Sequence, residues 1–173
     1  MRIFDYIQEG GPIMYVLLVL NIIGVALMIA KFMLLMREQK LTTINVASMQ
    51  EGLKTKTGSL SGEALIELIK QEIQSYMHGL EKGINTIKII AQIAPLLGLL
   101  GTVVGVLMAF KVISQTGMSN PANFAEGISV ALITTVGGLI VAIPHFIAHS
   151  YLLGYLDQIE STLERELISK VLK

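Results

Sequence analysis

Three long apolar stretches dominate this 173-residue sequence and limit what the chain can fold into. They run over residues 12–36, 89–113 and 124–153. Each exceeds the ~20 residues that a helix needs to cross a bilayer. Charged residues make up only 15% of the chain, whereas a soluble domain usually carries about 25%. The sequence therefore predicts an all-α membrane protein with three transmembrane helices in a lipid bilayer.

The first stretch is predicted to be a retained transmembrane helix rather than a signal peptide. The apolar region of a signal peptide is only about 7–15 residues long, whereas Pro12 to Leu35 is 24 residues. No small-residue cleavage site follows, because the next positions are occupied by Arg37, Glu38 and Lys40. Lys31 lies near the end of this span, where its aliphatic stem can reach the membrane interface.

The distribution of lysine and arginine predicts the orientation in the membrane. The segment 37–88 holds seven of these residues, the loop 114–123 holds none, and the tail 154–173 holds three. Cytoplasmic loops of membrane proteins carry the excess of positive charge. The N-terminus and the loop 114–123 are therefore predicted to be periplasmic, and the segment 37–88 and the C-terminus to be cytoplasmic.

The cytoplasmic parts are predicted to be helical extensions of the spans, so that residues 1–173 form one domain. Residues 52–62 read as a turn between two helices. The second of these helices is expected to run on through Gly79 and Gly83 into the second span. Apolar residues recur at helical spacing in the segment 37–88 and in the tail helix 154–173, namely Leu65, Ile69, Ile73 and Met77, and then Leu156, Ile159, Leu163 and Leu167.

Small residues recur every three or four positions along the second and third spans. Small residues let membrane helices approach closely, so they are predicted to pack these helices together. The candidate packing residues are Ala94, Gly98, Gly101, Gly105, Gly127, Ala131, Gly138 and Ala142. Each span also carries threonine within this pattern, Thr102 in one and Thr134 and Thr135 in the other. These threonines either pack helices or form a polar strip lining a cavity, and the pattern alone leaves both interpretations open.

Acidic residues are missing from the interior of the spans, and Glu126 at the outer end of the third span is the nearest. Proton relays through membranes usually use carboxylates or histidines. If the chain moves ions, the titrating carboxylate is therefore expected on a partner. His145 and His149 share a helix face and could serve a metal site or a relay, but an interfacial position for both is the favoured interpretation.

Other classes of function find no support in the sequence. There is no zinc-ligand cluster, phosphate-binding loop or nucleophile elbow. The formal net charge of zero gives no reason to expect nucleic acid. No enzyme activity, cofactor or metal is therefore predicted.

Two motifs resemble the span signatures of the MotA/TolQ/ExbB proton-channel family, and most of all those of ExbB. They are APLLGLLGTV at residues 94–103, and GISVALITTVGGL at 127–139 followed by AIP at 142–144. The resemblance implies a homopentameric ring in a bacterial inner membrane. The ring would surround a single-span partner like ExbD or TolR, whose intramembrane aspartate carries the proton.

The resemblance also implies roles for particular residues. Thr102 and Thr135 match the threonines that face the partner helix, and Thr134 lies beside them in the expected ion pathway. Val130 stands where relatives often have a glutamate, so that glutamate's role does not transfer. Three spans argue against a MotA-like stator, which has four. An ExbB-like role with a TonB-like protein is expected, and a TolQ-like role or a non-conducting scaffold is the alternative.

Overall fold

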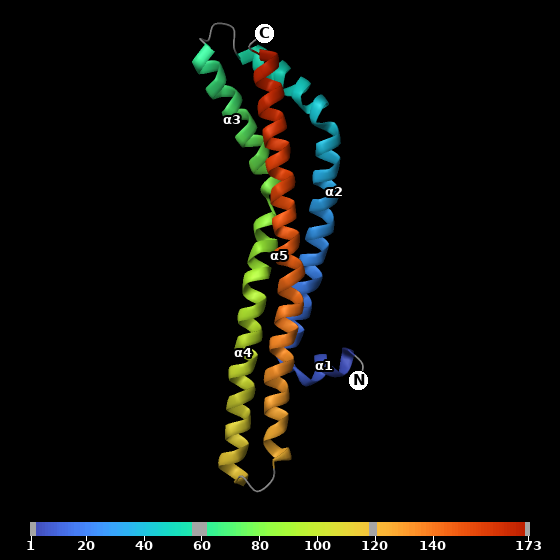
Figure 1. The fold of residues 1–173 in the computed structure, drawn as a ribbon, viewed down its shortest axis with the longest axis vertical. Coiled ribbons are helices and arrows are strands. Elements are labelled where there is room, and N and C mark those ends of the chain that lie inside the picture. The colour runs from blue at the N-terminus through green and yellow to red at the C-terminus, as the bar shows by residue number, and fades with distance from the viewer. Residues whose placement is uncertain (1–2, 57–61, 118–120, 172–173) are drawn as a thin grey trace. The chain divides into compact units, whose positions relative to one another are not determined.

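The computed structural model describes residues 3–56, 62–117 and 121–171. In these ranges the chain forms α1 (Ile3–Glu9), α2 (Gly11–Lys56), α3 (Gly62–Glu81), α4 (Ile84–Thr116) and α5 (Ala122–Val171) (Figure 1). Among the described residues, three segments are long and apolar enough to cross a membrane: Gly11–Leu41, Ile84–Thr116 and Phe124–Ser169. The predicted all-α architecture is confirmed, with three helices capable of spanning a membrane.

The chain divides into two compact units. The first unit comprises Met1–Met28 and Thr86–Ala148, and the second comprises Ile29–Asn85 and His149–Lys173. The first unit therefore holds the beginning of α2 with most of α4 and the first half of α5. The second unit holds the rest of α2 and α5 together with α3.

The first unit packs through small side chains and leaves large apolar ones outside. Its core cluster combines Leu17 of α2, Ile90 and Ala94 of α4, and Val141 and Ala142 of α5. Large side chains on the outer faces of the helices remain exposed, among them Leu107, Phe110, Leu132 and Ile140. This distribution suits a lipid environment, where lipid tails cover apolar side chains and close packing depends on small ones.

A short turn separates α1 from α2 at the beginning of the chain. Gly11 has a φ of 65°, a left-handed conformation that side chains other than glycine rarely adopt. The amide of Gly10 donates a hydrogen bond to the carbonyl of Tyr6 at 3.0 Å, which closes α1. The sequence pattern did not predict this seven-residue helix.

The second unit is held together by the amphipathic stripes of its helices. The apolar stripe of α3 buries Ile69, Ile73 and Met77. The apolar residues predicted for the tail helix are also buried, on α5, together with two residues of α2: Leu156, Ile159, Leu163 and Leu167, with Leu35 and Val46. Burial of one face of each helix is what the helical spacing of these residues predicts.

The expected continuous helix through Gly79 and Gly83 is wrong. The chain passes Gly79 as a helix, but α3 ends at Glu81 and α4 begins at Ile84. Between them Gly83 has a φ of 89°, which breaks the helix. Lys31 of α2 lies next to this break.

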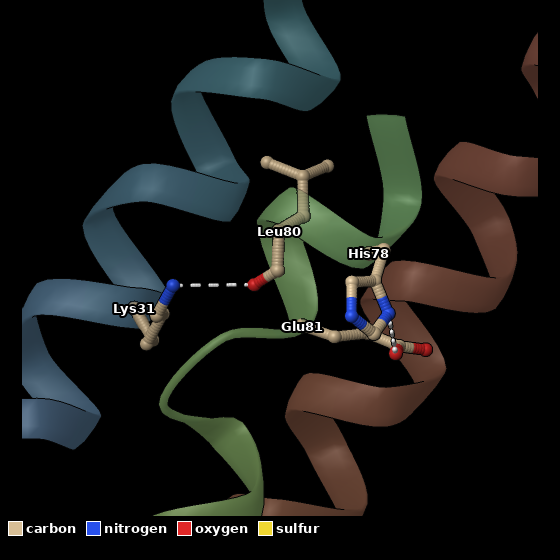
Figure 2. A network of polar contacts seen from close by, with 4 residues as sticks. All are labelled: Lys31, His78, Leu80 and Glu81. Atoms are coloured by element: carbon tan, nitrogen blue, oxygen red, sulfur yellow. Dashed lines mark hydrogen bonds and ion pairs between the residues drawn. The ribbon is translucent and has the colours of Figure 1, made fainter. Parts of the chain in front are cut away.

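Lys31 caps the C-terminal end of α3 (Figure 2). Its Nζ atom donates a hydrogen bond to the carbonyl of Leu80 at 3.2 Å. The last carbonyls of a helix have no partner within it and carry partial negative charge, so an ammonium group stabilises them. A Cβ atom on Gly83 would lie 3.2 Å from Cε of Lys31. Lys31 therefore joins α2 to the end of α3 within the second unit.

The turn predicted at residues 52–62 is helical in its first part. α2 continues as a helix through Gly52 to Lys56, and α3 begins at Gly62. The remaining residues, 57–61, lie outside the described part of the chain.

Candidate ion-pathway segment

The contact between α4 and α5 in the first unit is a close approach of two backbones. A Cβ atom on Gly105 would lie 2.5 Å from the carbonyl oxygen of Gly127, and one on Gly138 would lie 2.6 Å from the carbonyl oxygen of Ala94. Real Cβ atoms do not come closer than about 3.0 Å to such atoms. Side chains are therefore excluded at these positions. We call this contact the glycine seam, and its members are Ala94, Gly98, Gly101, Gly105 and Ala109 of α4 with Gly127, Ala131, Thr134, Thr135 and Gly138 of α5.

Thr134 fills the space that one glycine of the seam leaves open. It is fully buried, and a Cβ atom on Gly101 would lie 2.2 Å from its Oγ1. The hydroxyl of Thr134 donates to the carbonyls of Val130 at 2.8 Å and Ala131 at 3.0 Å, both on its own helix. Such a bond satisfies a threonine inside an apolar helix. In the single chain Thr134 therefore packs α5 against α4.

Thr135 ties the two helices together by a hydrogen bond. The residue is half-buried, and its Oγ1 lies 3.3 Å from the carbonyl oxygen of Gly98 and 3.3 Å from that of Ala131. The first acceptor is on α4 and the second on α5. The single hydroxyl proton is shared between them, so both lone pairs of the oxygen remain as acceptors.

Thr102 directly follows the seam position Gly101 on α4 and is also half-buried. Its Oγ1 donates to the carbonyl of Leu99 at 2.6 Å. Leu99 and Val103 on the same helix are exposed. Thr102 therefore sits where the glycine seam meets the exposed apolar face of α4.

The three candidate threonines thus belong to one stretch of the glycine seam. Thr134 and Thr135 meet α4 between Gly98 and Gly101, and Thr102 is the next residue of α4. Their hydroxyl protons are committed to backbone carbonyls, and those of Thr102 and Thr135 are only partly covered. An ion-pathway role for Thr102, Thr134 and Thr135 remains a prediction.

The side chain of His145 is buried against other parts of the chain, with 0% exposure inside the first unit. The interfacial position predicted for it stays a prediction. The Nδ1 atom of His145 lies 2.6 Å from the carbonyl oxygen of Val141, and its Nε2 has no hydrogen-bond partner in the described part of the chain. A Cβ atom on Gly24 would lie 1.9 Å from that Nε2. Gly24, a small residue within the first apolar stretch, was the signal that the sequence analysis missed.

His149 does not complete a metal site with His145. His149 is half-buried and belongs to the second unit. Among the described residues there is no group of three or more side chains of the metal-binding types placed to hold an ion.

The fold and the seam define a class of protein. They describe a multi-pass membrane protein whose spans pack through glycines and keep hydroxyls at the packing contact. Residues 38–165 match the MotA/TolQ/ExbB proton channel family. This match covers well over half of the chain, and the chain therefore belongs to the MotA/TolQ/ExbB family.

Individual relatives carry ExbB names. A biopolymer transport protein ExbB homolog from Methanothermobacter thermautotrophicus is 28% identical over 183 aligned residues, which cover 90% of this chain and 64% of that protein. Biopolymer transport protein exbB1 from Vibrio cholerae is 38% identical over 55% of this chain and 42% of that protein. ExbB from Aquifex aeolicus is 42% identical over 42% of this chain and 49% of that protein. The matched part of the chain thus spans between two fifths and two thirds of the length of these relatives.

Proposed function

We propose that this chain is the channel-forming subunit of a motor driven by the proton-motive force in a bacterial inner membrane. The subunit is ExbB-like and forms a homopentameric ring around the helix of an ExbD- or TolR-like partner. With a TonB-like protein, the complex energises transport across the outer membrane. The N-terminus is periplasmic and the C-terminus cytoplasmic, as the lysine and arginine counts predict.

The observation that carries this proposal is the pair of half-buried threonines at the glycine seam. A family of proton channels needs a titrating group, and the only acidic residue in the apolar stretches of this chain is Glu126, at the outer end of the third. Thr102 and Thr135 have partly covered hydroxyls at the seam, and the proposal assigns these hydroxyls to a carboxyl group from another chain. In this proposal, the aspartate of a single-span partner is the titrating group that carries the proton.

The hydrogen bonds of the threonines indicate which state of the partner they prefer. Because each hydroxyl donates to a backbone carbonyl, it presents only lone pairs to a group outside the subunit. A neutral carboxylic acid has a proton to donate and fits such an acceptor. A carboxylate needs a donor, so the hydroxyl must rotate away from the carbonyl of Leu99 or Gly98. Deprotonation of the partner is thereby coupled to the hydrogen bonds of the subunit.

The energies involved are of comparable size. A charged carboxylate in the centre of a bilayer costs at least about 2.5–3.5 kcal/mol. The membrane potential supplies about 2.3 kcal/mol per charge per 100 mV. A hydrogen bond to a charged group contributes about 1.5–3 kcal/mol. Two hydroxyls are therefore enough to decide whether the cycle runs.

The test is proton flux through the reconstituted complex of this chain with its single-span partner. The Thr102→Val/Thr135→Val double variant keeps the side-chain shape and removes both hydroxyls. Flux should fall at least about tenfold, because 1.36 kcal/mol corresponds to a factor of ten in rate. Ring size and partner binding, measured by native mass spectrometry, should not change.

The matched control is Thr116→Val. The hydroxyl of Thr116 also donates to a carbonyl of its own helix, that of Val112 at 2.9 Å, but it is exposed at the end of α4 away from the seam. This variant should conduct normally. Full flux in the double variant would refute the role of the hydroxyls and leave threonines that only pack helices. Absence of flux in the complex of the unchanged chain would favour the non-conducting scaffold. A TolQ-like role is the other alternative, and loss of envelope integrity rather than of outer-membrane uptake in a deletion strain would favour it.

A further inference from the structure

A hollow of about 490 Å³ opens on one face of α2 within the second unit. We call it the α2 hollow, and it is lined by Met33, Met36, Arg37, Lys40 and Leu41. The spacing of these residues places them on one face of the helix. The two methionines belong to the end of the apolar stretch 12–36, and Arg37 directly follows that stretch. An apolar half and a basic half therefore succeed one another along the same hollow.

The helices α3 and α5 pack on other sides of α2 at this level. Leu35 is fully buried. Glu38 accepts a hydrogen bond from the hydroxyl of Tyr76 on α3, and Gln39 donates one to Gln158 on α5 at 3.4 Å. The methionines of the hollow are exposed, and so are its basic side chains. The α2 hollow is thus an uncovered face in the described part of the unit.

The basic half of the hollow carries two positive charges about one helical turn apart. Neither Arg37 nor Lys40 forms an ion pair with a residue that the structure describes. Glu38, the acidic residue between them in sequence, contacts Tyr76 on α3 instead. A guanidinium group matches two oxygens of a phosphate, and an ammonium group binds phosphate as a point charge. The charge of the hollow therefore suits a phosphate group.

We propose that the α2 hollow binds one anionic phospholipid. Its phosphate contacts Arg37 and Lys40, and the beginning of an acyl chain lies against Met33 and Met36. Along the helix, Arg37 and Lys40 are roughly 6 and 10 Å beyond Met33, and a bilayer changes from hydrocarbon to headgroups over a similar depth.

Other ligands use the hollow less completely. A free phosphate contacts only the basic half. A zwitterionic lipid brings an ammonium group that Arg37 and Lys40 repel. An anionic phospholipid uses both halves and supplies the missing negative charge. The site consists of residues of one subunit, and it does not depend on the proposed ring, partner or motor.

The test is quenching of a single tryptophan by brominated lipids, on the full chain in vesicles. The chain has no native tryptophan, so Met33→Trp places the only one in the apolar half of the hollow. Bromine atoms on an acyl chain quench a tryptophan that they contact. Brominated phosphatidylglycerol should bind at least about tenfold more tightly than brominated phosphatidylcholine, because each basic residue near an anionic headgroup contributes about fivefold. Equal quenching by the two lipids overturns the inference.

Matched variants show whether the preference belongs to the hollow. With Met33→Trp in place, Arg37→Gln/Lys40→Gln should lower the preference to about one. Lys70→Gln/Lys82→Gln removes two exposed basic residues of the same unit that do not line the hollow, and the preference should remain. A preference that survives the first change, or falls as far with the second, overturns the inference.

Two further measurements separate this site from ordinary lipid contact and from a simple anion site. Val19→Trp, at an exposed apolar position of α2 in the first unit, should show no preference between the two lipids. Inorganic phosphate, compared with sodium chloride at equal ionic strength, should not restore the fluorescence of the Met33→Trp protein, because it cannot occupy the apolar half. An equal preference at Val19→Trp, or restoration by inorganic phosphate, overturns the inference.

Discussion

The replacement of Gly101 by alanine adds one methyl group at the tightest point of the glycine seam. The new Cβ would lie 2.2 Å from Oγ1, 2.4 Å from Cβ and 2.8 Å from Cγ2 of Thr134. A different rotamer of Thr134 cannot relieve this, because its Cβ does not move with rotation about χ1. The helices must therefore separate locally by about 1 Å to reach ordinary contact, which begins at 3.4 Å.

The expected magnitude follows from two opposing effects. Overpacking of a well-packed contact costs about 1–3 kcal/mol. Alanine is preferred over glycine inside a helix by about 0.5–1 kcal/mol. Gly154→Ala in α5 is the control for helix preference alone, because nothing lies within 4 Å of its added Cβ and overpacking is absent. The two alanine variants should thus differ by about 1–3 kcal/mol, or roughly 2–12 °C in unfolding midpoint at about 2–4 °C per kcal/mol.

The assay is thermal unfolding of the purified chain in detergent, followed by helix content. The decisive comparison is the Gly101→Ala/Thr134→Gly double variant, in which the obstructing side chain is absent. Its loss of stability should be smaller than the sum of the two single losses, because the two positions are in contact. If Gly101→Ala unfolds no earlier than the unchanged chain, or if the losses simply add, the packing role assigned to this pair is wrong.

Two further predictions concern the second unit. Lys31→Met should speed amide hydrogen exchange in the last turn of α3 about tenfold or more. The reason is that the carbonyl of Leu80 loses its charged donor, and a hydrogen bond to a charged group is worth about 1.5–3 kcal/mol. Unchanged exchange would mean that Lys31 does not hold this helix end. Burial, together with the hydrogen bond that Tyr76 donates to Glu38, raises the pKa of the Tyr76 hydroxyl above its usual 10.0. The folded state thus keeps its proton when the unfolded chain loses it, so stability should be full below about pH 10 and fall above it. The fall should be smaller in Tyr76→Phe, and an identical alkaline profile in both proteins would contradict the assignment.

The three spans could be predicted because they depend on a property that each segment carries by itself. A long apolar run needs no partner to be recognised, and the helical spacing of residues such as Ile69 and Leu163 shows which face will be buried. The glycines and alanines of the second and third spans indicated a packing surface for a similar reason. Their exchange for larger residues would be unfavourable against any close helix.

The features that the sequence did not reveal are pairwise. Gly79 and Gly83 carry the same local signal, yet only Gly83 breaks the helix, where Lys31 of α2 meets the end of α3. The burial of His145 likewise depends on Gly24, which lies on another helix. No periodicity within one segment contains this information, because each pair joins residues far apart in the chain.

The fit of Thr134 against Gly101 has a mechanical consequence. Glycine recurs on α4 three residues before Gly101, at Gly98, and four residues after it, at Gly105. A slide of α5 along α4 by one helical turn, about 5.4 Å, would bring Thr134 opposite another glycine, whereas at smaller slides it would meet positions that carry side chains. The seam therefore favours a set of discrete registers between the two helices. One helical turn is the smallest sliding step that avoids pushing them apart.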